Sequence, residues 1–325
     1  MEKIKFLTMA ALATAFFASC SNEDGLPQSN YPADNVVRIT TSVDGMNTRA
    51  SYGGSTAKLS SFGFCINNAG SDKYTYDNIK VTQENGKWNP ATQMLWQNST
   101  TAVDILAYAP YQANGNVKIF GKSDYAFSVK EDQSNAEDYS SDLIVYKQTG
   151  FTPGLELNTS KAVDVTFTHL LSQLNLTIEL RDQFNQDEKK PVTEATVTDV
   201  KVNGTIISSK VDFSASPISV QVDDTQEATA ITPETTEFKA AGKTTDHAAF
   251  NYSAIVIPQT VTAGNFSISF KVDGTDYIWT STSDVNFVSG NKHQLSLLVG
   301  KDVVQVKGIT ATPWGKENIT QGETD

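Results

Sequence analysis

The sequence "VDVTFTHLLSQLNLTIEL", residues 163–180, decides the fold class. Its apolar side chains occupy odd positions from Val163 to Phe167 and even positions from Leu174 to Leu180. A period of two is typical of a strand that buries one face, because successive side chains of a strand point to opposite faces. A shift of one residue exchanges the two faces. The passage therefore predicts two half-buried strands with a bend or bulge around residues 169–173.

Short alternating runs of the same kind cover the rest of the chain. "FSISFKV", residues 266–272, places four apolar side chains on one face. No segment shows the sustained apolar stripe of an amphipathic helix. Between the runs stand dipeptides that suit tight hairpins, because their residues accept a positive φ at little cost: Asn85-Gly86, Asn203-Gly204 and Asp273-Gly274. The sequence predicts an all-β protein of mostly antiparallel strands, arranged as β-sandwiches.

The length of the chain favours two domains. At 325 residues it exceeds the size that one hydrophobic core serves well. A turn-rich passage, "YKQTGFTPGLELNTS" (residues 146–160), interrupts the strand runs. We place the boundary there and expect an N-terminal β-sandwich over 50–158 and a C-terminal one over 159–325.

The first twenty residues, "MEKIKFLTMAALATAFFASC", have the pattern of a bacterial lipoprotein signal. Two lysines precede a short apolar run, and small residues lead to Cys20. The run is too short for a membrane-spanning helix, which takes about 20 residues. We expect residues 1–19 to be a signal peptide and Cys20 to be lipidated; an ordinary secreted protein is the alternative. The polar residues 20–35 predict a flexible tether.

The net charge argues against binding to nucleic acid, and the cysteine content argues against an intramolecular disulfide. The formal net charge is −12, and without a cluster of Lys and Arg we expect no binding to nucleic acid. The chain has two cysteines, so lipidation of Cys20 leaves only Cys65 and no intramolecular disulfide. Cys65 lies in the apolar run "SFGFCIN", which predicts a small buried side chain rather than a reactive thiol.

A search for catalytic or metal-binding motifs finds none that is specific. The three histidines lack the spacing of metal ligands, and zincin, nucleophile-elbow and phosphate-loop motifs are missing. "DGTD", residues 273–276, resembles the start of a calcium loop, but its remaining ligands are absent and a hairpin turn is the better interpretation. The many carboxylates of the chain leave open that two of them act as the catalytic pair of a glycosidase, but the sequence does not single out any two. We expect no cofactor, no metal and no enzymatic activity.

The four tryptophans allow two interpretations. They would serve as stacking surfaces for sugar rings, or they would pack in the core or at its margin. The second is the simpler account for residues that follow strand-like runs. The tryptophans are Trp88, Trp96, Trp279 and Trp314.

The stretch "VVRITTSVDGMNTRAS", residues 36–51, joins a strand to an exposed basic residue. Val37, Ile39 and Val43 alternate like the buried face of a strand. The run then stops in a polar linker that contains Arg49 and Ala50.

Several passages in a fixed order resemble the fimbrillin family, the Mfa-like type V pilins of Gram-negative anaerobes. The order extends from the lipobox to the last tryptophan. The passages are "FFASC", "NTRAS", "DILAYAPY", "DLIVY", "VTFTHLLSQLNLTIEL", "NFVSGNKHQLSLLVGKDVVQV" and "ITATPWGKE". The resemblance implies two transthyretin-like β-sandwich domains, an outer-membrane lipoprotein at the cell surface and assembly with other pilin subunits into a fimbrium.

The resemblance also implies how the subunit matures. In that family an Arg-specific protease cuts after an arginine that follows the first strand. Arg49 matches by position, and Ala50 becomes the new N-terminus, so that residues 36–49 form a removable strand and its linker. Arg38 lies inside the strand run, where a ladder shields the backbone. The alternative is that Arg49 is only a solvated linker residue.

The family donates a C-terminal strand to the neighbouring subunit. Here the corresponding residues are Val303, Val304, Val306 and Ile309. The alternative is a last strand that stays in its own domain. A lipid-anchored surface protein, serving as pilus anchor or tip or binding a host glycan or protein, is the second functional hypothesis.

Overall fold

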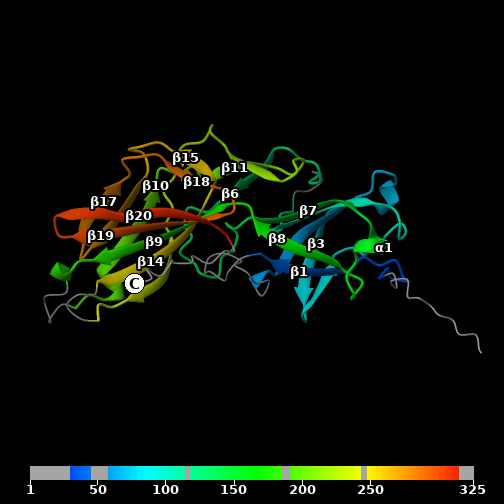
Figure 1. Ribbon diagram of the computed structural model, residues 1–325, viewed down its shortest axis with the longest axis horizontal. Coiled ribbons are helices and arrows are strands. Elements are labelled where there is room, and N and C mark those ends of the chain that lie inside the picture. Colours follow the sequence, from blue (N-terminus) through cyan, green and yellow to red (C-terminus); the bar gives the residue numbers. More distant parts are fainter. Residues whose placement is uncertain (1–29, 45–57, 114–117, 185–190, 243–246, 315–325) are drawn as a thin grey trace, which may run out of the picture.

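The computed structural model describes residues 30–44, 58–113, 118–184, 191–242 and 247–314. Strands gather in two lobes of an elongated molecule, with β1 in one lobe and β20 in the other (Figure 1). The short helix α1 (Pro153–Glu156) lies at the far end of the first lobe. None of the helices in these ranges has the length and hydropathy to cross a membrane. The predicted all-β class is confirmed.

A seven-stranded sheet forms the N-terminal lobe. The first strand of the chain pairs in parallel with its only neighbour in this sheet, and all the other pairs are antiparallel. In spatial order the strands are β1 (Ile39–Val43), β8 (Val163–His169), β7 (Ile144–Phe151), β5 (Val103–Ala109), β2 (Ser61–Asn67), β3 (Tyr76–Glu84) and β4 (Lys87–Pro90).

The C-terminal lobe contains a five-stranded sheet and smaller ones. The large sheet has the order β13 (Glu234–Lys239), β14 (Ala248–Val256), β9 (Ser172–Leu180), β19 (Asn291–Gly300) and β20 (Val303–Pro313). The smaller sheets are β10 (Val197–Asn203), β16 (Ser267–Val272) and β17 (Thr275–Thr280); β12 (Ser219–Val222), β11 (Ser208–Asp212) and β6 (Tyr125–Ser128); and β15 (Gln259–Val261) with β18 (Val285–Phe287).

The phase change in residues 163–180 marks the passage between the lobes. β8 buries its odd positions, and β9 buries its even positions from Leu174 to Leu180, so the predicted bend is confirmed. β8 belongs to the seven-stranded sheet and β9 to the five-stranded one. The chain therefore changes sheet between His169 and Ser172, later than the expected division at 158/159, because the turn-rich passage before β8 leads back into the first sheet.

One segment of the N-terminal half crosses to the other lobe. β6 lies between β5 and β7 in sequence but pairs with β11. Nearby, Gln133 exchanges two hydrogen bonds with the backbone of Ile255, 2.9 and 2.7 Å long. The two lobes are thus joined by this segment, which pairs with the C-terminal lobe, as well as by the β8–β9 connection.

The described residues form two hydrophobic cores. The N-terminal core lies between the inner faces of the curved seven-stranded sheet, and a second core begins on the opposite face of that sheet and continues through the C-terminal lobe. Cys65 belongs to the second core and is fully buried, as predicted, and burial raises the pKa of its thiol. Central residues of the N-terminal core are Phe62, Phe64, Ile105, Val165 and Phe167; those of the second core include Leu176, Ile178, Phe250, Phe266 and Leu297.

Two of the three predicted hairpins are confirmed. Asn85-Gly86 joins β3 to β4 and Asp273-Gly274 joins β16 to β17, with positive φ at all four residues. The hairpin predicted at Asn203-Gly204 is wrong, because β10 and β11 lie in different sheets. A side chain at Gly204 would place its Cβ 2.0 Å from the carbonyl oxygen of Asn265. This glycine permits close backbone contact instead of a hairpin turn.

Candidate functional site: the two terminal strands

The first strand, β1, is an edge strand with a buried face. It pairs with β8 from Ile39 opposite Val163 to Val43 opposite Phe167. Val37 is 3% exposed, and Ile39 and Val43 are each 7% exposed. All three belong to the N-terminal core. The three side chains predicted to form a removable strand therefore occupy an apolar site in their own lobe, while their removal remains a prediction.

Polar contacts hold the opposite face of β1. Asn158 donates to the hydroxyl of Thr40 at 3.1 Å and to the carboxylate of Asp164 at 2.6 Å, and Thr40 donates to the same carboxylate. Ser42 donates to Thr166 at 3.0 Å. These contacts are exposed or half-buried, so the apolar face contributes most of the stability of the strand.

The chain before β1 is attached to the lobe. The backbone N–H of Val37 donates to Met94 at 3.0 Å, and that of Trp96 donates to Asn35 at 2.8 Å. Asn30 donates to the carbonyl of Leu157 at 2.9 Å. Residues 30–35, expected as the end of the tether, thus contact the N-terminal lobe because their backbone finds partners there.

The residues predicted to direct export and cutting lie in other parts of the chain. Residues 1–19, Cys20, Arg49 and Ala50 lie outside the described residues. The described part of the first segment ends at Asp44, whose N–H donates to the carbonyl of Phe167 at 2.8 Å. Arg38, the other basic residue nearby, forms an ion pair with Asp34 at 2.6 Å. The Arg38 hydrogen bond lowers the pKa of Asp34 to about 2.

The last described strand, β20, is also an edge strand. It pairs in an antiparallel manner with β19, with a register shift between Ser296 and Leu297. Its apolar side chains are poorly covered: Val303, Val306 and Ile309 are 44%, 46% and 42% exposed, and Val304 is half-buried. The predicted donor residues thus lie in a strand that stays paired within its own lobe in this structure.

Polar side chains connect β20 to the rest of its sheet. The ammonium group of Lys307 lies 2.8 Å from the Glu179 carboxylate, and Arg181 donates to the side chain of Gln305. Both contacts are on the exposed surface, where ion pairs contribute at most about 1 kcal/mol. The ladder with β19 and the residue after β20 provide the stronger attachment.

That residue, Trp314, is anchored at the junction of the lobes. It is 7% exposed and its N–H donates to the carbonyl of Gly290 at 2.7 Å. Its ring stacks on His169, which lies 2.9 Å from the carboxylate of Asp142. Lys292 places its ammonium 5.6 Å from the centre of the Trp314 ring. Burial lowers the pKa of this lysine.

Sequence reasoning did not find this cluster, although Asp142 and His169 each stand at the edge of a predicted apolar run. A buried carboxylate and a buried imidazole require each other's hydrogen-bonding capacity, but their pairing is visible only once β7 and β8 adjoin. The sequence analysis also did not predict the role of Lys147. Its ammonium donates to three carbonyls at 2.8–2.9 Å and thereby connects β7 to the C-terminal lobe; the carbonyls are those of Phe213, Ser214 and Ala215.

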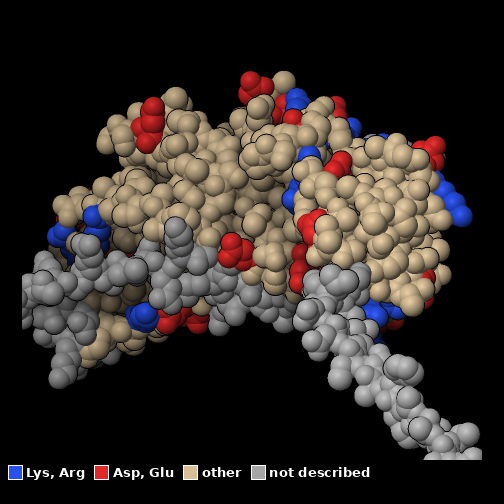
Figure 2. Space-filling view, turned by 45° about the vertical axis from the view of Figure 1, so that its right-hand side comes forward, with Lys and Arg blue, Asp and Glu red and all other residues tan. Residues whose placement is uncertain are grey.

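Other chemistry of the described parts is sparse. No group of three or more His, Cys, Asp or Glu side chains in the described ranges is arranged to hold a metal ion. On the face drawn in Figure 2, Lys and Arg side chains are interspersed with Asp and Glu and form no continuous basic area. Of the strands at sheet edges, the two terminal ones, β1 and β20, are those that the sequence analysis singled out.

The sequence profile of fimbrillin-like proteins matches residues 48–314. The chain belongs to the fimbrillin-like family. Membership of the fimbrillin-like family supports the role of a fimbrial subunit. The strands at the sheet edges matter for such a role, because a fimbrium is assembled from subunits. A search of curated protein sequences finds no match to this chain.

Solved structures share the fold of this fimbrillin-like chain. A candidate cell adhesion protein from Bacteroides uniformis is 19% identical with a TM-score of 0.55, and one from Bacteroides ovatus is 12% identical with a TM-score of 0.61. Each comparison covers 87% of this chain and 99% of the other. A fimbrial protein from Bacteroides vulgatus is 16% identical with a TM-score of 0.50, over 85% of this chain and 99% of the other. These similarities establish a shared fold.

Proposed function

We propose that this chain is a structural subunit of a fimbrium that polymerises by β-strand donation and supports adhesion. It is exported as an outer-membrane lipoprotein through Cys20 and carried on the cell surface. An Arg-specific protease cuts after Arg49, and Ala50 becomes the N-terminus. Its partners are other pilin subunits and, in adhesion, a host glycan or protein. Its role is structural rather than catalytic and requires no cofactor.

The observation that carries this proposal is the position of β1 at a sheet edge with a buried apolar face. Burial of an aliphatic side chain contributes about 1.5–3 kcal/mol, so Val37, Ile39 and Val43 together contribute roughly 5–9 kcal/mol as an upper estimate. Loss of β1 would uncover the apolar site and the edge of β8. Such an edge accepts a strand from another chain by β-augmentation.

Cutting matters because β1 competes with any incoming strand. While β1 remains attached, its linkage gives it an effective concentration of ~mM at its own site. An incoming strand of similar affinity is dilute by comparison. A cut after Arg49 separates β1 from the rest of the subunit, so β1 becomes an ordinary dissociable peptide.

The exposure of β20 supports its role as donor. An incoming strand needs a row of apolar side chains on one face. Val304, Val306 and Ile309 stand opposite the buried residues of β19 and share a face, because the register shift in the ladder offsets their uneven spacing. Val303 stands opposite Gly300 on the other face. Three of these residues are more than two-fifths exposed, so their burial in a neighbouring subunit would gain free energy that the isolated subunit lacks.

The experiment compares the N-terminus and the assembly state of the unaltered chain with those of Arg49→Ala. The expected result is a surface-derived chain that begins at Ala50 and forms polymers, and an uncut, monomeric Arg49→Ala variant. Arg38→Ala is the matched control and is expected to mature normally. Polymers made of chains that begin at Cys20 would contradict the proposal.

A second candidate is a permanently lipid-anchored protein of the fimbrium. The observation that favours it is the attachment of β20 in its own lobe, with Trp314 buried at the junction. Such a protein accepts or anchors other subunits without donating a strand. In the same experiment it would retain Cys20 at the N-terminus and remain in the membrane fraction after fimbriae are sheared off.

A further inference from the structure

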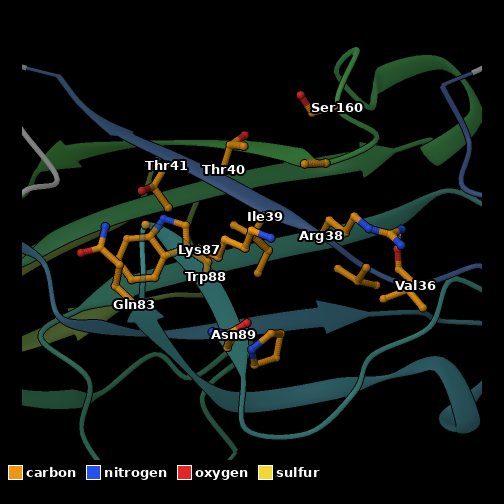
Figure 3. A pocket seen from close by; sticks show the side chains of 14 residues that line it. Val36, Arg38, Ile39, Thr40, Thr41, Gln83, Lys87, Trp88, Asn89 and Ser160 are labelled. Atoms are coloured by element: carbon orange, nitrogen blue, oxygen red, sulfur yellow. Dashed lines mark hydrogen bonds between the residues drawn. The ribbon is translucent and has the colours of Figure 1, made fainter.

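A groove lies between the two end strands of the seven-stranded sheet (Figure 3). β1 and β4 stand at opposite ends of the strand order, so each has a single neighbour in that sheet. The curvature of the sheet brings them to opposite sides of a groove of about 790 Å³. This volume falls in the range of about 300–1,000 Å³ that is usual for ligand sites.

The two sides of the groove are joined at one end. There the bridge between Val36 and Leu95 and the hydrogen bond from Val37 to Met94 hold the two sides together. The lining continues along β1 to Thr41 and along the β3–β4 hairpin to Gln83 and Gly86. A short elongated ligand would therefore lie along the groove, with one end at the closed side.

Trp88 gives the groove a rigid aromatic wall. Its ring is half-buried and packs edge-on with the fully buried Phe62, with ring centroids 5.0 Å apart and planes at 68°. Trp96 and Trp314 are buried in the structure, and Trp279 lies in the other lobe. Of the four tryptophans, Trp88 is thus the one in the lining of this groove. A held ring with an open side suits stacking against the apolar face of a pyranose.

Polar side chains from both sides line the rest of the groove. The side-chain amides of Gln83 and Asn89 come from the β3–β4 hairpin. The guanidinium of Arg38, the residue before β1, lies on the far side of Ile39 from Trp88 (Figure 3). The Thr41 hydroxyl oxygen is buried without a hydrogen-bond partner in the described part of the chain. Amides and guanidinium groups bind neighbouring hydroxyls through paired donors and acceptors. This combination of one aromatic ring and several neutral or matched polar groups fits a carbohydrate.

The charges favour a neutral ligand. The guanidinium of Arg38 already forms two hydrogen bonds with the carboxylate of Asp34. The other cation in the lining is the exposed Lys87. An acidic glycan would therefore meet a single uncompensated charge at the solvent-exposed margin, where the attraction is weak.

We propose that this groove binds a short neutral oligosaccharide, which stacks on Trp88 and hydrogen-bonds to Gln83, Asn89 and Arg38. β1 supplies one wall, so the site is complete in the uncut chain. A cut after Arg49 followed by loss of β1 would remove that wall. This link to maturation rests on the proposed function, whereas the site itself rests on the groove.

The test is isothermal titration of the purified full-length, uncut chain with maltohexaose, cellohexaose, chitohexaose and oligogalacturonate. At least one neutral oligosaccharide is expected to bind. Trp88→Ala is expected to weaken this binding at least tenfold, and Asn89→Ala, which removes one hydrogen-bonding group on the surface, about 2- to 10-fold. Trp279→Ala, the same change in the other lobe, is the matched control and leaves binding unchanged.

Trp88 also contacts the core, so Trp88→Ala could fail to fold. In that case Trp88→Phe and Gln83→Ala replace it in the titration. Trp88→Phe is expected to retain weakened binding, because an aromatic ring remains. Absence of binding to every neutral oligosaccharide overturns the proposal, as does binding that survives both the Asn89 and the Trp88 changes. A peptide of residues 303–313 that binds in the groove, with no saccharide doing so, would identify a strand-acceptor edge and would equally overturn it. None of these outcomes depends on whether the chain is cut or polymerises.

Discussion

The indole ring of Trp314 lies parallel to the imidazole ring of His169, with centroids 3.8 Å apart and planes inclined by 6°. His169 is the last residue of β8, and Trp314 directly follows β20. The stack therefore connects the C-terminal strand to the N-terminal sheet. β8 contacts both terminal strands, β1 through the parallel ladder and β20 through this stack.

Replacement of Trp314 by Ala should loosen β20 more than the rest of its sheet. Truncation of a buried tryptophan costs about 3–5 kcal/mol, and here the loss falls on the end of an edge strand with little other cover. The amide hydrogens of β20 are expected to exchange faster, while those between β9 and β14 keep their protection. Hydrogen exchange measures both, with Trp279→Ala as the control. Equal loss of protection across the whole sheet would contradict a local role for the stack.

The stability of the fold should decline between pH 7 and pH 5 because of His293. Burial lowers the pKa of its imidazole below the ordinary value of 6.5, and the N–H of Val288 donates to its Nε2 at 3.1 Å. The unfolded chain therefore binds this proton first as the pH falls. The contribution is complete above pH 6.5 and is lost as the pH falls through 6.5 toward the lower folded pKa.

His293→Gln should reduce this pH dependence, because an amide oxygen accepts the same hydrogen bond without titrating. Urea unfolding at a series of pH values measures the free energy of unfolding for both chains. An unchanged slope in His293→Gln would assign the effect to other groups.

Local pattern was enough to predict some of these elements. The alternation in residues 163–180 gave β8, β9 and the bend, since burial of one face imposes a period of two. The same reasoning gave the buried face of β1. The sequence does not reveal that β1 pairs in parallel with β8, because that depends on a partner more than a hundred residues away. The Asp142–His169–Trp314 cluster was missed for the same reason, as its members come from three separate segments.

Weakening β1 should partly replace its removal, if strand donation is the mode of assembly. Ile39→Ala removes a buried side chain at a cost of about 2–5 kcal/mol, which lowers the competition that β1 offers to an incoming strand. The uncut variant is expected to bind a peptide of residues 303–313 more tightly than the unaltered uncut chain. Fluorescence anisotropy of the labelled peptide measures this. Ser42→Ala changes the outer face of the same strand and should leave peptide binding near that of the unaltered chain; equal binding by all three chains would argue against β1 as the competing strand.

Gly204 should tolerate alanine far less well than Gly264, although both have a positive φ, of 91° and 84°. Alanine in this conformation costs about 1–2 kcal/mol at either site. At Gly264 a new Cβ meets nothing within 4 Å, but at Gly204 it lies 2.0 Å from the carbonyl oxygen of Asn265. Because that atom belongs to the backbone before β16, relief of the clash must move β10 away from β16, and overpacking of this kind adds about 1–3 kcal/mol. Urea unfolding of the two variants measures the difference, and equal midpoints would show that contact with Asn265 is not what requires glycine between β10 and β11.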